Sequence, residues 1–212
     1  MKTTIEELIE RYPCLDVCRE DILKLEGMML DTFKRGGKLL LCGNGGSAAD
    51  CDHIAGELLK GFLSKRPLDK ETADKFRRAL GERAEEYIST LQGGLPVISL
   101  PSQTAVVSAF SNDVDPEFVY AQLVLGFASE NDLLIAISTS GNSKNIVRAA
   151  EAAKALGISV AALTGKNESA LSAITDVTVR VPETETYKIQ EIHLPVYHYL
   201  CAAVEEHIFE TF

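Results

Sequence analysis

The sequence predicts an α/β fold in which a doubly wound parallel sheet lies between two layers of helices. Short, wholly apolar runs recur along the 212-residue chain, and stretches with the apolar period of a helix lie between most of them. An apolar run without polar alternation is typical of a strand buried on both faces of a parallel sheet. Because such folds bind ligands at the carboxyl ends of their strands, we expect function in the turns that follow the strands.

Two helices are expected before the first strand. Overlapping capping-box patterns between Thr3 and Glu7 precede apolar residues, so a first helix should begin there and end near Tyr12-Pro13. A longer helix follows, because apolar residues from Val17 to Phe33 recur mostly at steps of three and four until Gly36-Gly37. These N-terminal helices precede the alternating part of the chain.

The rest of the chain completes one predicted domain, residues 1–212. The predicted strands are 39–42, 95–100, 133–137, 158–163 and 177–181, and a final long helix is expected over about 189–208. A segment at about 64–94 is dense in both charge signs and has a helical period, so we interpret it as an insertion. It is either a solvated helix packed on the rim or a lid over a site.

Composition excludes several classes of protein. Lys and Arg number 21 against 31 Asp and Glu, and no basic patch stands out, which argues against a general affinity for nucleic acid. No apolar run approaches the roughly 20 residues that span a bilayer, and the acidic N-terminus lacks the apolar core of a signal peptide. Five scattered cysteines are not a disulfide framework. We therefore expect a soluble, cytoplasmic protein with reduced thiols and neither a nucleic-acid nor a membrane partner.

A glycine-rich turn follows the first strand. In Cys42-Gly43-Asn44-Gly45-Gly46-Ser47, the glycines let the backbone turn sharply and approach a ligand, and Ser47 can cap the next helix. Amide groups at a helix N-terminus favour an anion, although such turns also serve simply to connect a strand to a helix. The turn is neither a Walker loop nor the dinucleotide fingerprint, so no nucleotide cofactor is predicted.

A second turn, Ser138-Thr139-Ser140-Gly141-Asn142-Ser143, follows the strand at 133–137. It holds four hydroxyls within six residues, at a point where a strand passes into a helix. Ser, Asn and Gly are also ordinary cap and turn residues, but four hydroxyls exceed what the cap of one helix needs. The turn therefore predicts a phosphate site that uses hydroxyls, amides and the helix dipole without a cation.

His53 and Glu57 are candidates for metal binding or proton transfer. They lie four apart on a predicted helix, the spacing at which two side chains share a metal or a proton path, but such a pair is more often a surface contact. Third partners are available in the last helix, where Gln190, Glu191, His193 and His198 cluster.

Gln190 and His198 would lie roughly 12 Å apart along a straight helix axis. Pro195 is expected to kink this helix. Either the kink brings the two side chains together, or long side chains converge, or different subunits contribute them. His193 and His207 are interpreted as packing or surface residues of the helix.

These segments together resemble the sugar isomerase (SIS) domain, and within it the phosphoheptose isomerase branch. The strings CGNGGSAAD, ISTSGNS, LTGK at 163–166 and IQEIHLPVYH at 189–198 occur in the family's order and spacing, as do His53 and Glu57. The resemblance covers nearly all of the chain except the insertion. It implies a cytoplasmic homotetramer of flavodoxin-like SIS subunits with active sites at subunit interfaces. The implied reaction converts sedoheptulose 7-phosphate to D-glycero-D-manno-heptose 7-phosphate by acid/base proton transfer through an enediol.

The resemblance also implies roles for single residues. The implied phosphate cradle is Ser138, Thr139, Ser140 and Ser143; the other implied substrate contacts are Asn44, Gly45, Gly46, Ser47, Asn112, Asp113 and Gln190. Glu57 and His198 fall on the catalytic acid/base positions. In members that bind zinc, the ligand positions correspond to His53, Glu57, Gln190 and His198, a set without thiolate that would tolerate other divalent ions.

Two departures from the family pattern bear on the choice of sugar. Gly61, beside Lys60, stands where the family usually has an arginine, and Tyr187 stands where an aspartate is common. A non-catalytic SIS protein that binds a phosphosugar or a replication-initiator protein as a regulator is the alternative. Because such regulators replace the positions of Glu57 and His198, the presence of both favours the enzyme. A sensor with a DNA-binding module would need a helix-turn-helix, and no candidate is left over.

Overall fold

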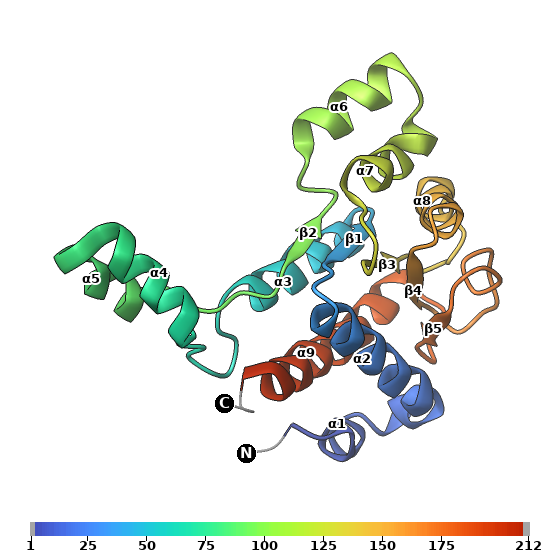
Figure 1. The fold of residues 1–212 in the computed structure, drawn as a ribbon. Coiled ribbons are helices and arrows are strands. Elements are labelled where there is room, and N and C mark those ends of the chain that lie inside the picture. Colours follow the sequence, from blue (N-terminus) through green and yellow to red (C-terminus); the bar gives the residue numbers. More distant parts are fainter. Residues whose placement is uncertain (1–2, 210–212) are drawn as a thin grey trace.

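Within residues 3–209, which a computed structural model describes, the chain forms a five-stranded parallel sheet between two layers of helices (Figure 1). The strands are β1 (Leu39–Gly43), β2 (Val97–Ser99), β3 (Leu133–Ile137), β4 (Ser159–Thr164) and β5 (Val177–Arg180). Every pairing is parallel and the strand order is β2-β1-β3-β4-β5. The predicted fold class is confirmed. The second strand is shorter than the apolar run that predicted it.

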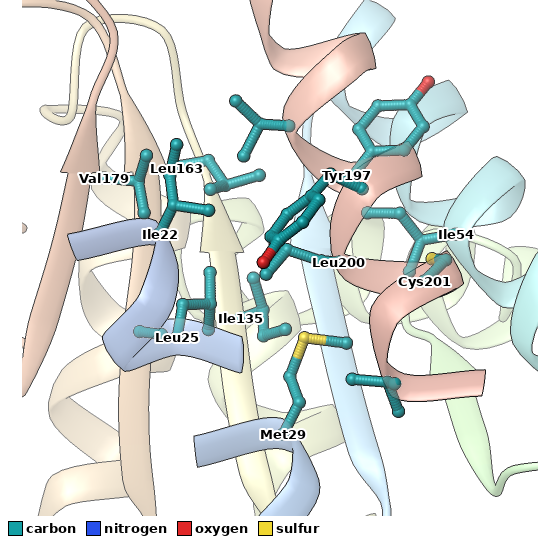
Figure 2. Packing of buried hydrophobic residues seen from close by; sticks show 14 of the residues in the cluster. Ile22, Leu25, Met29, Ile54, Ile135, Leu163, Val179, Tyr197, Leu200 and Cys201 are labelled. Carbon is teal, nitrogen blue, oxygen red and sulfur yellow. The ribbon is translucent and has the colours of Figure 1, made fainter. Parts of the chain in front are cut away.

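One face of the sheet carries the helices from both ends of the chain. They are α1 (Ile5–Arg11), α2 (Arg19–Lys34), α3 (Gly46–Leu59) and α9 (Thr186–Phe209), with a 3-10 turn η1 (Pro13–Cys18) between the first two. Figure 2 shows Ile135 and Leu163 of the sheet packed with Met29 of α2 and Leu200 of α9. This layer places α3 and α9 in contact, and these two helices carry the predicted acid/base residues.

The opposite face carries α6 (Thr104–Asp113), α7 (Val119–Phe127) and α8 (Lys144–Ala155), with η3 (Pro116–Phe118) before α7. Alternate strand residues, such as Leu40, Leu134 and Ala162, point into this second core. The strands are therefore buried on both faces, which explains why they read as continuous apolar runs.

The segment at 64–94 folds into two helices, α4 (Lys70–Leu80) and α5 (Ala84–Thr90), joined by η2 (Gly81–Arg83). The pair projects from the body of the molecule in Figure 1. Ala73 and Ala84 are its buried residues, and the rings of Phe76 and Tyr87 stack with centroids 5.9 Å apart. The interpretation as a solvated helical element fits this arrangement better than a lid over its own subunit.

The helix α9 differs in two ways from the expectation. It begins at Thr186, earlier than predicted, and continues unbroken past Pro195. All five cysteines are free, as expected. No helix within residues 3–209 is both long and apolar enough to cross a membrane.

The strand order determines where a ligand can bind. From β1 the sheet grows to β2 on one side and to β3 on the other. The connections after β1 and β3 therefore run to opposite faces and leave a crevice between their carboxyl ends. Both predicted ligand turns follow these two strands.

Candidate functional site

The glycine-rich turn after β1 is shaped by two close approaches. Gly45 has φ +56°, a conformation that L side chains rarely adopt, and Ser47 donates its N–H to the Asn44 carbonyl at 3.0 Å. A Cβ on Gly46 would overlap the side-chain amide of Gln190 from α9. The turn is therefore tight because the backbone bends at Gly45 and because Gln190 occupies the space beside Gly46.

The turn after β3 presents its hydroxyls at the start of α8. Ser138 continues the sheet through its N–H to the Leu163 carbonyl at 3.1 Å, and its Oγ donates to Ser143 Oγ at 3.2 Å. The Ser140 side chain is exposed, with its Oγ accepting from the Asn142 N–H at 3.2 Å. Ser143 is the N-cap residue but makes no side-chain cap. The first amides of α8 consequently remain available to an anion.

The segment after β4 braces this turn. Gly165 donates its N–H to the Thr139 carbonyl at 3.0 Å, and the Gly141 carbonyl accepts from Leu171 N–H at 3.1 Å. Gly141 has φ +65°, and a Cβ there would overlap the Ser169 side chain. The hydroxyl turn is therefore held from both sides by backbone bonds, which leaves its side chains free to face a ligand.

An amide pair joins the two turns. Asn44 donates to Asn145 Oδ1 at 2.8 Å, and Asn145 donates back to Asn44 Oδ1 at 3.0 Å. Asn145 belongs to the first turn of α8. Sequence analysis missed it, although its place directly after the hydroxyl cluster was a usable signal. The pair fixes the spacing of the two turns across the crevice.

A second cluster forms where α3 and α9 cross. His53 Nε2 lies 3.2 Å from Glu57 Oε1 and 3.4 Å from His198 Nε2. Phe62 packs against the His198 ring, with centroids 5.6 Å apart. The sequence suggested that His53 and Glu57 need a third partner, and the structure supplies His198 on a helix that runs unbroken through Pro195.

A hydrogen-bonded chain behind His53 fixes the orientation of its ring. Tyr197 donates its hydroxyl to Asp50 Oδ1 at 3.3 Å and lies 3.0 Å from His53 Nδ1. These contacts hold the His53 ring with its Nδ1 towards Tyr197 and its Nε2 towards Glu57 and His198. Neither Asp50 nor Tyr197 was singled out from the sequence, since a tyrosine on an apolar helix face looks like core.

The protonation states of the cluster follow from its surroundings. Burial raises the pKa of Glu57, but the Lys60 ammonium, 2.9 Å from Glu57 Oε2, and His53 lower it by more, so the pKa lies below the usual value. Burial and the neighbouring His53 lower the pKa of His198. At neutral pH the cluster therefore holds a carboxylate beside a neutral imidazole, which suits a base and a partner that handles oxygen-bound protons.

The comparisons with known proteins agree with this geometry. Two family models, both described as SIS domain, match residues 14–95 and 105–203. A phosphoheptose isomerase from Crocosphaera subtropica is 40% identical over 86% of this chain and 80% of its own length. The chain belongs to this family of SIS-domain proteins.

Other members of the phosphoheptose isomerase family match as broadly. The protein of that name from Trichlorobacter lovleyi is 35% identical over 90% of this chain and 84% of its own. The solved phosphoheptose isomerase of Neisseria gonorrhoeae has a TM-score of 0.74 at 28% identity, covering 95% of this chain and 94% of that one. That of Francisella tularensis has a TM-score of 0.72 at 30% identity, covering 88% and 86%.

The remaining residues implied by the family lie outside the α3–α9 cluster. Gln190 contacts Gly46 at the start of α3 rather than His198. Asn112 and Asp113 end α6, where the Asn112 amide donates to Asp113 Oδ1 at 2.8 Å and both side chains are exposed. One chain thus places these groups at three separate positions: the two joined turns, the acid/base cluster, and the Asn112-Asp113 pair.

Proposed function

We propose that this chain is a phosphosugar aldose–ketose isomerase that interconverts sedoheptulose 7-phosphate and D-glycero-D-manno-heptose 7-phosphate. The observation that carries the proposal is the convergence of an ionised Glu57 and a neutral His198 on one point between α3 and α9. The names of the related proteins supply the class of sugar.

The reaction moves one proton between the first two carbons of an open-chain sugar. In the direction from ketose to aldose, Glu57 takes the proton from C1 while His198 donates one to the carbonyl oxygen at C2, which gives an enediol. His198 then takes back a proton from the hydroxyl at C1. Glu57 then returns its proton to C2, and the enediol oxygen at C1 becomes the new carbonyl. Both residues end in the state in which they began.

The phosphate would be held by the turn after β3. The hydroxyls of Ser138, Thr139, Ser140 and Ser143 and the free amides at the start of α8 offer donors without a fixed cation. Asn44, Gly45, Gly46 and Ser47 would line the sugar, together with Gln190 beside them. This arrangement would bind the unreactive end of the substrate and leave its carbonyl end unbound.

One subunit cannot present both ends to the same molecule. At 1.5 Å per residue, Glu57 lies roughly 16 Å along the axis of α3 from Gly46, whereas an extended heptose chain with its phosphate spans only about 10 Å. A second copy supplying the missing half would close the gap. Apolar side chains of the α6–α7 region support such an assembly, because Val114 is 68% and Leu125 62% exposed. We propose the homotetramer implied by the family, in the cytoplasm, where the free cysteines would stay reduced.

Zinc is proposed as a cofactor, with one ion per site. Among residues 3–209, no group of three His, Cys, Asp or Glu side chains is placed so that it could hold a metal ion. The donors nevertheless fit in chemistry: two edges of the cluster, at 3.2 and 3.4 Å, match the roughly 3.3 Å between ligands of a tetrahedral ion with 2.0–2.1 Å bonds. His53, Glu57 and His198 would hold the ion after small side-chain rotations. Gln190 would have to come from elsewhere in the assembly. Bound zinc would polarise the sugar oxygens.

The decisive experiment is turnover of sedoheptulose 7-phosphate by the purified protein, followed by NMR of the sugar carbons. We expect conversion, and its loss in Glu57→Gln and His198→Asn with the fold and phosphate binding intact. Ser140→Ala should instead raise KM. Full activity in either acid/base variant would refute their roles, and binding without turnover by the wild type would favour another phosphosugar or a regulatory role.

A further inference from the structure

An ion pair closed off from solvent lies at the end of α3. Arg66 Nε is 2.6 Å from Glu205 Oε1, and the two side chains are 0% and 2% exposed. A buried pair is weak evidence for stability, because removing two charges from water costs about as much as their attraction returns. The role of the Arg66–Glu205 pair follows instead from the backbone groups that it holds in place.

The guanidinium holds the helical turn that carries Glu57. Arg66 Nη1 donates to the Leu58 carbonyl at 2.6 Å, and Nη2 donates to the Glu57 carbonyl at 3.0 Å. These carbonyls belong to the last turn of α3, where the helix offers no amide partner. Arg66 itself has φ +43°, which is unusual for a residue other than glycine. The backbone adopts this conformation where the guanidinium reaches the end of α3.

The carboxylate holds the chain that leaves α3. Glu205 Oε1 accepts from the Phe62 N–H at 2.8 Å, and Oε2 accepts from those of Leu63 and Ser64 at 2.7 and 3.2 Å. Glu205 lies on α9 about two turns after His198, so both project from one face of that helix. The pair thus joins the turn of Glu57 to the helix of His198 at a single buried point.

We propose that Arg66 and Glu205 are positioning residues that set the distance between the Glu57 carboxylate and the His198 imidazole. The inference rests on the proposed isomerase function. Acid/base catalysis is sensitive to such placement, and a shift of about 1 Å costs up to about 100-fold in rate. The glycine-rich turn lies at the other end of α3 and the phosphate turn at the start of α8, so neither contacts this pair.

The test is the split between kcat and KM in Glu205→Gln. An amide keeps the shape but loses the charge and one acceptor oxygen, so we expect kcat per folded molecule to fall about 10- to 100-fold with KM changed by less than about two-fold. The folded fraction is measured by circular dichroism in the assay buffer, so that a loss of stability is not counted as a loss of rate.

The chain offers a matched control in Asp132→Asn. Asp132 is also buried, lies 2.6 Å from the Lys38 ammonium and accepts from the backbone N–H groups of Lys38 and Ser129 at 2.9 and 2.7 Å. It stands directly before β3, and its partners Lys38 and Ser129 belong to neither α3 nor α9. This variant should lose stability while kcat per folded molecule stays at the wild-type value.

Arg66→Lys covers the case in which Glu205→Gln does not fold. Lysine keeps the charge but cannot reach Glu205 and both α3 carbonyls at once, so kcat should again fall with KM held. Wild-type kcat in the folded variants, or an equal loss in Asp132→Asn, would overturn the positioning role. Absence of turnover in the wild type would overturn the proposed function, and the positioning role with it.

Discussion

The buried imidazole of His193 predicts a loss of stability in mild acid. The side chain is 0% exposed, its Nδ1 is buried without a hydrogen-bond partner, and its Nε2 lies 3.3 Å from the Thr164 carbonyl. Burial lowers the pKa of His193 from 6.5 to about 4. Between these two pKa values, His193 therefore stays neutral in the folded protein and becomes protonated in the unfolded chain.

The sign and size of the effect follow from linkage. Above pH 6.5 the imidazole is neutral in both states and contributes no pH dependence. As the pH falls towards 4, the unfolded state binds the proton first, so the free energy of unfolding drops. The full difference in pKa corresponds to about 3 kcal/mol, of which about 2.5 kcal/mol is lost by pH 4.5. That is a large part of the stability of a typical domain.

His193→Phe isolates this contribution. The ring retains the volume, and the Thr164 carbonyl keeps its bond from the Val181 N–H at 3.0 Å. We would measure urea unfolding of both proteins at pH 7.5 and pH 4.5. The variant should gain about 2 to 3 kcal/mol on the wild type between the two conditions, since the remaining carboxylates contribute equally to both. An unchanged difference between the two proteins would refute the argument.

Three further predictions concern the site. Gly141→Ala should raise KM for the sugar phosphate about ten-fold or more, because φ +65° costs a residue with a side chain roughly 1–2 kcal/mol and the new Cβ would overlap Ser169. The control is Gly157→Ala, which has φ +75° but open space around the Cβ and should lose stability without a change in KM. Leu125→Glu should dissociate the assembly in analytical ultracentrifugation and abolish turnover, and an active monomer would contradict a shared site. Dialysis against a chelator should lower activity and zinc should restore it, whereas full activity in protein shown metal-free by elemental analysis would remove zinc from the reaction.

The elements that sequence analysis predicted well are those specified by short stretches of chain. The apolar runs of β1 and β3 specify buried strands, and the glycines and hydroxyls after them specify tight turns, because each signal lies within about six residues. Adjacent turns then follow from the topology of a doubly wound sheet. The position of the two turns at the switch point could thus be predicted without knowing any long-range contact.

The residues that escaped prediction act across long separations. Asn145 is recognisable only through Asn44, Tyr197 only through His53 and Asp50, and Arg66 only through Glu205, a residue far along the chain. Each looks ordinary in its own segment, since a tyrosine on an apolar helix resembles core and an arginine in a charged stretch resembles surface. The helix α9 continues through Pro195 for a related reason: packing against α2 and α3 holds the helix together where local preference alone would break it.

The length of α3 explains why the site divides as it does. Its first turn belongs to the ligand crevice, through Gly46 and Gln190, and its last turn carries Glu57. A helix of 14 residues is roughly 21 Å long, which exceeds the reach of a heptose phosphate. In the proposed reaction the same helix would line the sugar at one end and carry the base at the other, and a neighbouring copy would present the end that one subunit places out of reach. The proposed assembly would then be a requirement of the chemistry, because an isolated subunit would bind the sugar where it cannot react.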